Sequence, residues 1–128
     1  LDMARGSGTM RGSGCQSEGG ISMPHYMFRA SYTQAGIQGV VKDGAAARNK
    51  VVQALAESVG GKVVCQYWAF GDDDYIVITE LPDNAAAMAI AATVGATGTS
   101  SVTTTVLLQA AEVDDAIGRR TVYRAPGA

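Results

Sequence analysis

The chain contains a single histidine, His25, so few kinds of acid–base or metal chemistry are open to it. A Ser-His-Asp triad would depend on this one position near the start of the folded sequence, and a two-histidine metal centre would need a second imidazole. No strand–GxGxxG–helix pattern and no GxxxxGK[ST] sequence occurs. The sequence therefore predicts no metal, nucleotide or other cofactor, and we expect His25 at the surface or at a strand edge.

A set of polar and aromatic side chains on or near predicted strands could instead form a ligand pocket. An apolar pocket with a few polar groups is the usual small-molecule site, in which a tyrosine could orient a phenol or enol and an arginine could hold an anion. Alternatively, the rings fill a core or an interface and the arginine pairs with Asp74 or Glu80. The candidates are Arg29, Tyr32, Tyr67, Trp68, Asp74 and Tyr75.

Three consecutive carboxylates, Asp72–Asp74, follow Gly71 in a predicted turn. Gly71 permits a positive φ, and the acidic side chains can accept hydrogen bonds from backbone amides of the turn. Carboxylates also attract divalent cations, but consecutive side chains point in different directions and no second acidic cluster is evident. We expect a solvated turn rather than a metal site.

Composition indicates a globular protein that binds neither nucleic acid nor a membrane. The 128 residues are 47% hydrophobic and 17% charged, with a net charge of -2. A nucleic-acid partner would require a basic patch, and a membrane span would require about 20 apolar residues. We expect a cytoplasmic protein.

Cys15 lies in a glycine-rich segment and Cys65 in an apolar strand, so we expect no structural disulfide and a buried thiol at Cys65.

Two regions differ in composition. Residues 1–22 are rich in glycine and serine and have no apolar periodicity, which predicts a flexible segment, either a tag or upstream translation. Residues 23–128 form one predicted domain.

Hydrophobic periodicity places the elements of this domain in the order β-α-β-β-α-β. A helix capped by Thr33 should break near Asp43-Gly44 and stop at Gly60-Gly61, and Asp83 or Asn84 should cap a second helix through about Val94. The order predicts an α+β, ferredoxin-like fold, with a four-stranded antiparallel sheet and both helices on one face. The expected strands are Tyr26–Tyr32, Val63–Phe70, Asp74–Leu81 and Ser101–Leu108, followed by a short helical turn.

The face of the sheet that lacks helices avoids charge. Alternation along the second strand predicts that Val63, Cys65, Tyr67 and Ala69 lie on one face of the sheet and that Val64, Trp68 and Phe70 lie on the other. The third strand groups Tyr75, Val77 and Thr79 against Ile76, Ile78 and Glu80. A solvated face would alternate apolar with charged residues, so we expect a second copy of the chain to cover this face, sheet against sheet.

Several short motifs together resemble the GYD-domain family over Met23 to about Pro126. They are Arg29-Ala30-Ser31-Tyr32-Thr33, Gly36-Ile37, Gly60-Gly61-Lys62, Ala69-Phe70-Gly71-Asp72-Asp73-Asp74, Leu81-Pro82-Asp83-Asn84 and Thr104-Thr105-Val106-Leu107-Leu108. The resemblance implies a ferredoxin-like unit akin to the dimeric α/β-barrel proteins, a group that includes small monooxygenases and many members without a known activity. One departure is Asp73, which stands where the family usually has tyrosine.

Three functions are consistent with these features. The first is a homo-oligomeric barrel that binds a small apolar or aromatic molecule. The second is a cofactor-free monooxygenase or isomerase that uses a tyrosine, Arg29 or Asp74. The third is a structural module in which the sheet face serves only assembly. The first is our prediction from the sequence.

Overall fold

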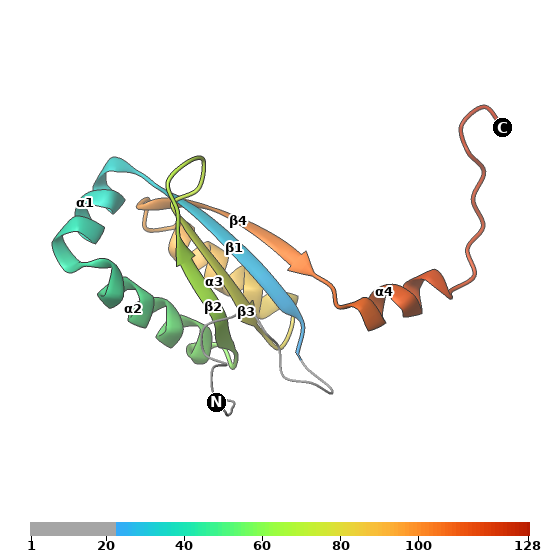
Figure 1. Cartoon of the computed structure of the whole chain (residues 1–128), viewed down its shortest axis with the longest axis horizontal. Helices are drawn as coiled ribbons and strands as arrows, with labels where there is room; N and C mark the ends of the chain where they lie inside the picture. The colour runs from blue at the N-terminus through green and yellow to red at the C-terminus, as the bar shows by residue number, and fades with distance from the viewer. Residues whose placement is uncertain (1–22) are drawn as a thin grey trace, which may run out of the picture.

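The computed structural model describes residues 23–128, in which four antiparallel strands form one sheet in the order β2-β3-β1-β4 (Figure 1). This arrangement confirms the predicted ferredoxin-like α+β fold, while the predictions for residues 1–22 lie outside the described part of the chain. The elements are β1 (His25–Tyr32), α1 (Gln34–Asp43), α2 (Ala45–Ser58), β2 (Lys62–Trp68), β3 (Tyr75–Glu80), α3 (Asn84–Gly95), β4 (Ser100–Leu107) and α4 (Ala110–Ile117).

Local sequence signals start and stop these helices as expected. The Thr33 hydroxyl accepts the backbone N–H of Gly36 at 3.2 Å and caps α1. Gly44 has a φ of 91°, a left-handed conformation that glycine adopts without strain, so the chain leaves α1 there and begins α2 in a new direction. The Asp83 carboxylate accepts the N–H of Ala86 at 2.9 Å and caps α3.

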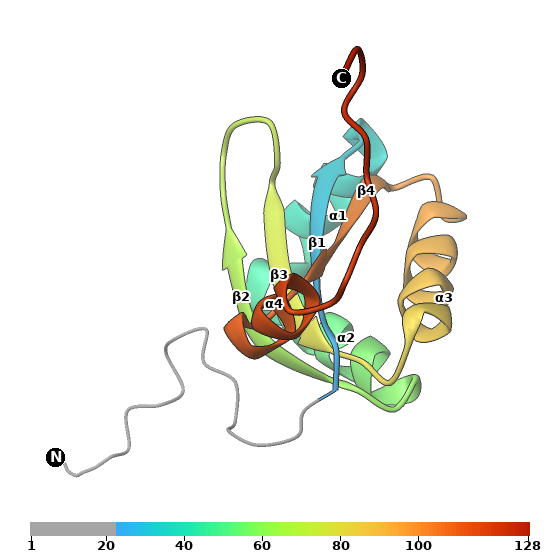
Figure 2. The ribbon, with the colours of Figure 1, turned by 90° about the vertical axis from the view of Figure 1, so that its right-hand side faces the viewer.

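The sheet has two unlike faces, which we call inner and outer. The inner face carries Tyr26, Phe28 and Ala30 of β1 and packs toward α2 and α3, because alternate residues of a strand point to the same side. The buried core is formed by Tyr26, Phe28, Ala30, Tyr75, Val77, Leu81, Ala86, Ala87 and Ile90. Figure 2 shows α3 beside β4, at one edge of the sheet.

A β-bulge in β2 corrects one predicted grouping. Val63 pairs with Thr79 and Cys65 with the adjacent Ile78, so β2 advances two residues where β3 advances one. Val63 therefore lies on the inner face and packs against the core together with Trp68. Its predicted grouping with Cys65 and Tyr67 is wrong, because simple alternation takes no account of an extra residue.

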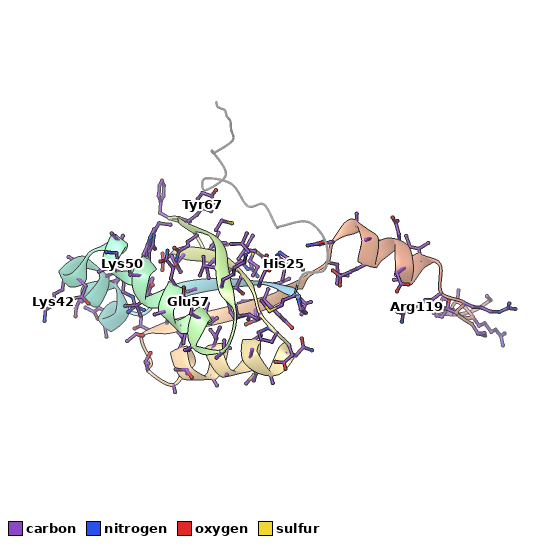
Figure 3. The ribbon with its side chains drawn as sticks, turned by 90° about the horizontal axis from the view of Figure 1, so that it is seen from below. His25, Lys42, Lys50, Glu57, Tyr67 and Arg119 are labelled. Carbon is purple, nitrogen blue, oxygen red and sulfur yellow. The ribbon has the colours of Figure 1, made fainter. Side chains whose placement is uncertain are left out.

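After β4 the chain leaves the body of the domain. Helix α4 lies beyond the end of β4 and points away from the sheet in two perpendicular views (Figures 1 and 3). None of its residues is buried, and Val113 and Ile117 are 40% and 74% exposed. Within residues 23–128, no helix combines the length and the apolar character needed to cross a membrane.

Candidate functional site

A cavity of about 430 Å³ lies between the inner face of the sheet and helices α2 and α3. Helix α2 contacts β2 and helix α3 contacts β4, so the two helices sit toward opposite edges of the sheet and leave this space between them. The volume is in the range typical of small-molecule sites. The lining residues are Phe28, Ala30, Tyr32, Arg48, Val51, Val52, Leu55, Ala56, Tyr75, Val77, Thr79, Ile90, Thr93, Val94, Thr97, Thr99, Ser100 and Val102.

The polar groups of the cavity gather toward one end of the strands. Tyr32 is the last residue of β1 and pairs with Ser100, the first residue of β4, while Tyr75 begins β3. Arg48 lies near the start of α2 and contributes to the electrostatic environment of Tyr75. We call this region the polar end. Toward the other end of the strands, the walls include Leu55 and other apolar residues such as Ala56, Val77 and Ile90.

Three aromatic rings pack against one another at the polar end. The Tyr32 and Trp68 rings stack with centroids 6.0 Å apart and planes inclined by 14°. The Trp68 and Tyr75 centroids are 4.6 Å apart, with planes inclined by 53°. Offset or tilted packing at these separations is favourable because ring edges and faces carry opposite partial charges. The two tyrosines line the cavity and Trp68 supports both of them.

A chain of amide hydrogen bonds fixes the phenol of Tyr75. The Gln66 side-chain N–H donates to the Tyr75 hydroxyl, and the Gln66 carbonyl accepts from the Gln53 amide at 2.8 Å. The Trp68 indole N–H donates to the Asn49 side chain at 3.1 Å, which also ties β2 to α2. Burial is the main cause that raises the pKa of Tyr75 to about 12, so the hydroxyl stays protonated at neutral pH.

The six side chains predicted from the sequence do not form one site. Tyr32 and Tyr75 line the cavity, with Trp68 directly behind them. The Asp74 carboxylate instead accepts the backbone N–H of Tyr32 at 2.8 Å, so it holds the end of β1 in place. The other two candidates, Arg29 and Tyr67, belong to the outer face.

On the outer face, Arg29 and Tyr67 are both register partners of Ile76. Tyr67 is 51% exposed and projects from the side of the sheet opposite to α3 (Figure 3). The Arg29 guanidinium lies 3.5 Å from the carboxylate of Asp73, rather than pairing with Asp74 or Glu80 as the alternative interpretation required. Asp73, which departs from the family pattern, therefore forms an ion pair with Arg29 on this face.

The turn that contains Asp73 is structural. Gly71 has a positive φ of 158°, and the backbone carbonyl of Asp72 accepts the Ser31 hydroxyl at 2.6 Å. With Asp73 facing Arg29 and Asp74 bound to β1, the three acidic residues make separate contacts. Within residues 23–128 no group of three potential metal ligands comes together.

His25 and Cys65 differ from expectation. His25 lies on the interior strand β1 and is only 8% exposed. Its imidazole lies 3.5 Å from the carboxylate of Glu80. His25 is buried because it pairs with Glu80 of β3 on one side and with Leu107 of β4 on the other. The expected position at the surface or at a strand edge is therefore wrong. Cys65 is disulfide-bonded, which corrects the expectation of a free thiol.

Arg48 was missed as a candidate. It lines the cavity together with Val51, Val52 and Leu55, all from α2. These positions follow the spacing i, i+3, i+4, i+7, which is one face of a helix. Extending the apolar stripe by one turn toward the N-terminus would have found this arginine. The hydroxyls of Thr97 and Thr99 carry no comparable sequence signal, because they lie in the connection between α3 and β4.

The GYD domain matches this chain over residues 26–117, a span that runs from β1 to the end of α4. The chain belongs to the GYD domain family. No curated protein and no solved structure matches it. In this GYD domain the cavity is lined by phenols, hydroxyls, one guanidinium and apolar walls, while no carboxylate, imidazole or thiol of the described residues lines it. Such groups can hold and orient a ligand.

Proposed function

We propose that this GYD domain binds a small, largely apolar molecule in the cavity beneath the sheet. The observation that carries the proposal is the cavity of about 430 Å³ itself, which has apolar walls and a few convergent polar groups at one end. A packed core leaves few voids larger than a water molecule, so a space of this size within a small domain favours an occupant. Burial raises the pKa of Tyr75 to about 12, so its phenol stays protonated at neutral pH and can donate a hydrogen bond to a bound molecule.

A cavity-filling substitution tests this function. Val52 is half-buried and lines the cavity, so Val52→Phe should occupy part of the space and weaken binding of a neutral apolar probe such as 1-octanol. Val41→Phe is the matched control, because Val41 is 81% exposed and does not line the cavity. Isothermal titration calorimetry should detect octanol binding to the unmodified chain and to Val41→Phe, with about tenfold weaker binding to Val52→Phe, in line with the usual cost of overpacking. No binding to the unmodified chain would refute the proposal.

The same proposal includes a homo-oligomer assembled through the outer face. Met27 pairs with Ile78, and Ile76 lies next to Tyr67, so neighbouring strands carry an apolar strip along this face. Contiguous exposed apolar surface marks an interface in many proteins. Helix α4 adds a second apolar surface, because it projects from the domain with Ile117 exposed.

Native mass spectrometry tests the assembly. The unmodified chain should give a dimer or a higher even assembly. Ile76→Lys places a charge in the apolar strip of the outer face, next to Tyr67, and should give monomers, whereas Val41→Lys places the same charge on α1 and should leave the assembly intact. A monomeric unmodified chain, or an Ile76→Lys variant that still assembles, would contradict assembly through this face.

A further inference from the structure

We propose that the ligand is an amphipathic carboxylate, held with its carboxylate at Arg48 and its apolar part along the cavity toward Leu55 and Ile90. This inference rests on the proposed binding function and names the chemical class of the ligand. Medium-chain fatty acids and arylalkanoic acids share the required chemistry, which is one anionic head on an apolar body. The observations that carry it are the charge, the hydrogen-bonding groups and the shape of the cavity.

Arg48 is the only charged side chain among the described residues that line the cavity. It is half-buried, and no carboxylate within residues 23–128 forms an ion pair with it. A guanidinium that faces a mostly apolar space without a counter-ion favours an anion there, because the two charges attract strongly where water is scarce. Its planar fork of N–H groups matches a carboxylate with two parallel hydrogen bonds.

The neighbouring hydroxyls supply donors rather than competing acceptors. The Tyr75 oxygen already accepts the Gln66 N–H, so its own proton remains available for a ligand oxygen. Burial keeps this phenol neutral, and so able to donate, well above neutral pH. Tyr32 also lines the cavity, and its hydroxyl makes no hydrogen bond within residues 23–128. Two phenol donors and one guanidinium together suit the oxygens of a single carboxylate.

The remainder of the cavity fits an apolar chain or ring. Along β3 the wall runs from Tyr75 through Val77 to Thr79, a length of about 13 Å at the usual rise per residue of a strand. Thr79 donates its hydroxyl to the backbone carbonyl of Tyr26, so it presents no free donor at this end. The apolar side chains of Leu55 and Ile90 add to the cavity wall from α2 and α3. A ligand with a second charged group would leave that group without a partner there.

Paired ligands and paired variants test the inference by isothermal titration calorimetry on the full chain. Octanoate and 1-octanol have the same apolar chain and differ in the head group. The unmodified chain should bind octanoate at least about tenfold more tightly than octanol, in line with a charge-assisted hydrogen bond. Arg48→Gln should abolish this preference, and Arg48→Lys should retain part of it because the positive charge remains.

Lys50→Gln is the matched control, since it removes the same charge from an exposed position of α2 outside the cavity lining (Figure 3). It should leave the preference for octanoate unchanged. Equal affinity for the two ligands in the unmodified chain, or a preference that survives Arg48→Gln, would overturn the carboxylate inference while octanol binding still supported the cavity. Failure to bind either ligand would overturn the proposed function together with the inference.

Discussion

Replacing Gly36 with alanine should separate α1 from the polar end of the cavity. Gly36 is buried in the first turn of α1, and an added Cβ would lie 2.0 Å from the backbone carbonyl oxygen of Thr99 and 2.9 Å from the Tyr32 ring. The same carbonyl accepts the backbone N–H of Thr33 at 2.9 Å. Because a backbone carbonyl cannot rotate away as a flexible side chain can, α1 or the Thr99 segment must shift.

Two costs and one gain set the size of the change in the free energy of unfolding. Overpacking a well-packed site costs about 1–3 kcal/mol, and weakening the Thr33–Thr99 hydrogen bond costs about 1 kcal/mol more. Alanine recovers up to about 1 kcal/mol relative to glycine within a helix. We therefore expect Gly36→Ala to lower the free energy of unfolding by about 2 kcal/mol. Gly39→Ala in the same helix meets no atom within 4 Å and should raise it by about 0.5–1 kcal/mol.

Urea denaturation followed by the fluorescence of Trp68 measures both changes, because Trp68 is the single tryptophan of the chain and packs against the core. The midpoints should move in opposite directions for Gly36→Ala and Gly39→Ala, with an unchanged dependence on urea concentration. Gly36→Ala should also weaken octanol binding, since Tyr32 and Thr99 line the cavity. A Gly36→Ala variant as stable as Gly39→Ala would show that the contact with Thr99 is not tight.

Three further predictions concern side chains that fix the strands and helices. Asp74→Ala should lower the free energy of unfolding by about 1–3 kcal/mol in urea titrations, because the backbone N–H of Tyr32 loses its acceptor. The control Asp72→Ala removes an exposed carboxylate and keeps the backbone carbonyl that Ser31 uses, so it should change this free energy little. Because burial raises the pKa of Tyr75 from 10.0 to about 12, the unfolded chain releases this proton first, so stability should fall as the pH rises from 10 toward 12. Tyr75→Phe should lose less stability over that interval, and an equal loss would contradict the assignment. Asp83→Ala should lower the free energy of unfolding, measured by thermal denaturation, by about 0.5–2 kcal/mol, because α3 loses its N-terminal cap. Asp83→Asn, which can also cap the helix, should keep most of this free energy.

The sequence predicted the fold well because its local signals agree with the tertiary arrangement. The Thr33 and Asp83 caps, the break at Gly44 and the alternation along β1 each depend on near neighbours in the chain. The bulge in β2 was missed, since it depends on how β2 pairs with β3 rather than on the residues of β2 alone.

The residues of the candidate site were predicted less completely for a related reason. Tyr32 and Tyr75 were identified from their residue type, but the cavity they line exists because α2 and α3 lie toward opposite edges of the sheet. Periodicity gives the apolar face of a helix and says nothing of its distance from a second helix. Arg29 and Tyr67 had the right chemistry for a pocket, and only the pairing of β1 and β2 with β3 places them on the outer face.

The start of β1 and the end of β4 lie side by side at one end of the sheet, because His25 pairs with Leu107. The polar end of the cavity is at the opposite ends of these strands, about 23 Å away for eight residues at the usual rise. A dye or a solid support attached beside the start of β1 or the end of β4 would therefore lie far from Tyr32.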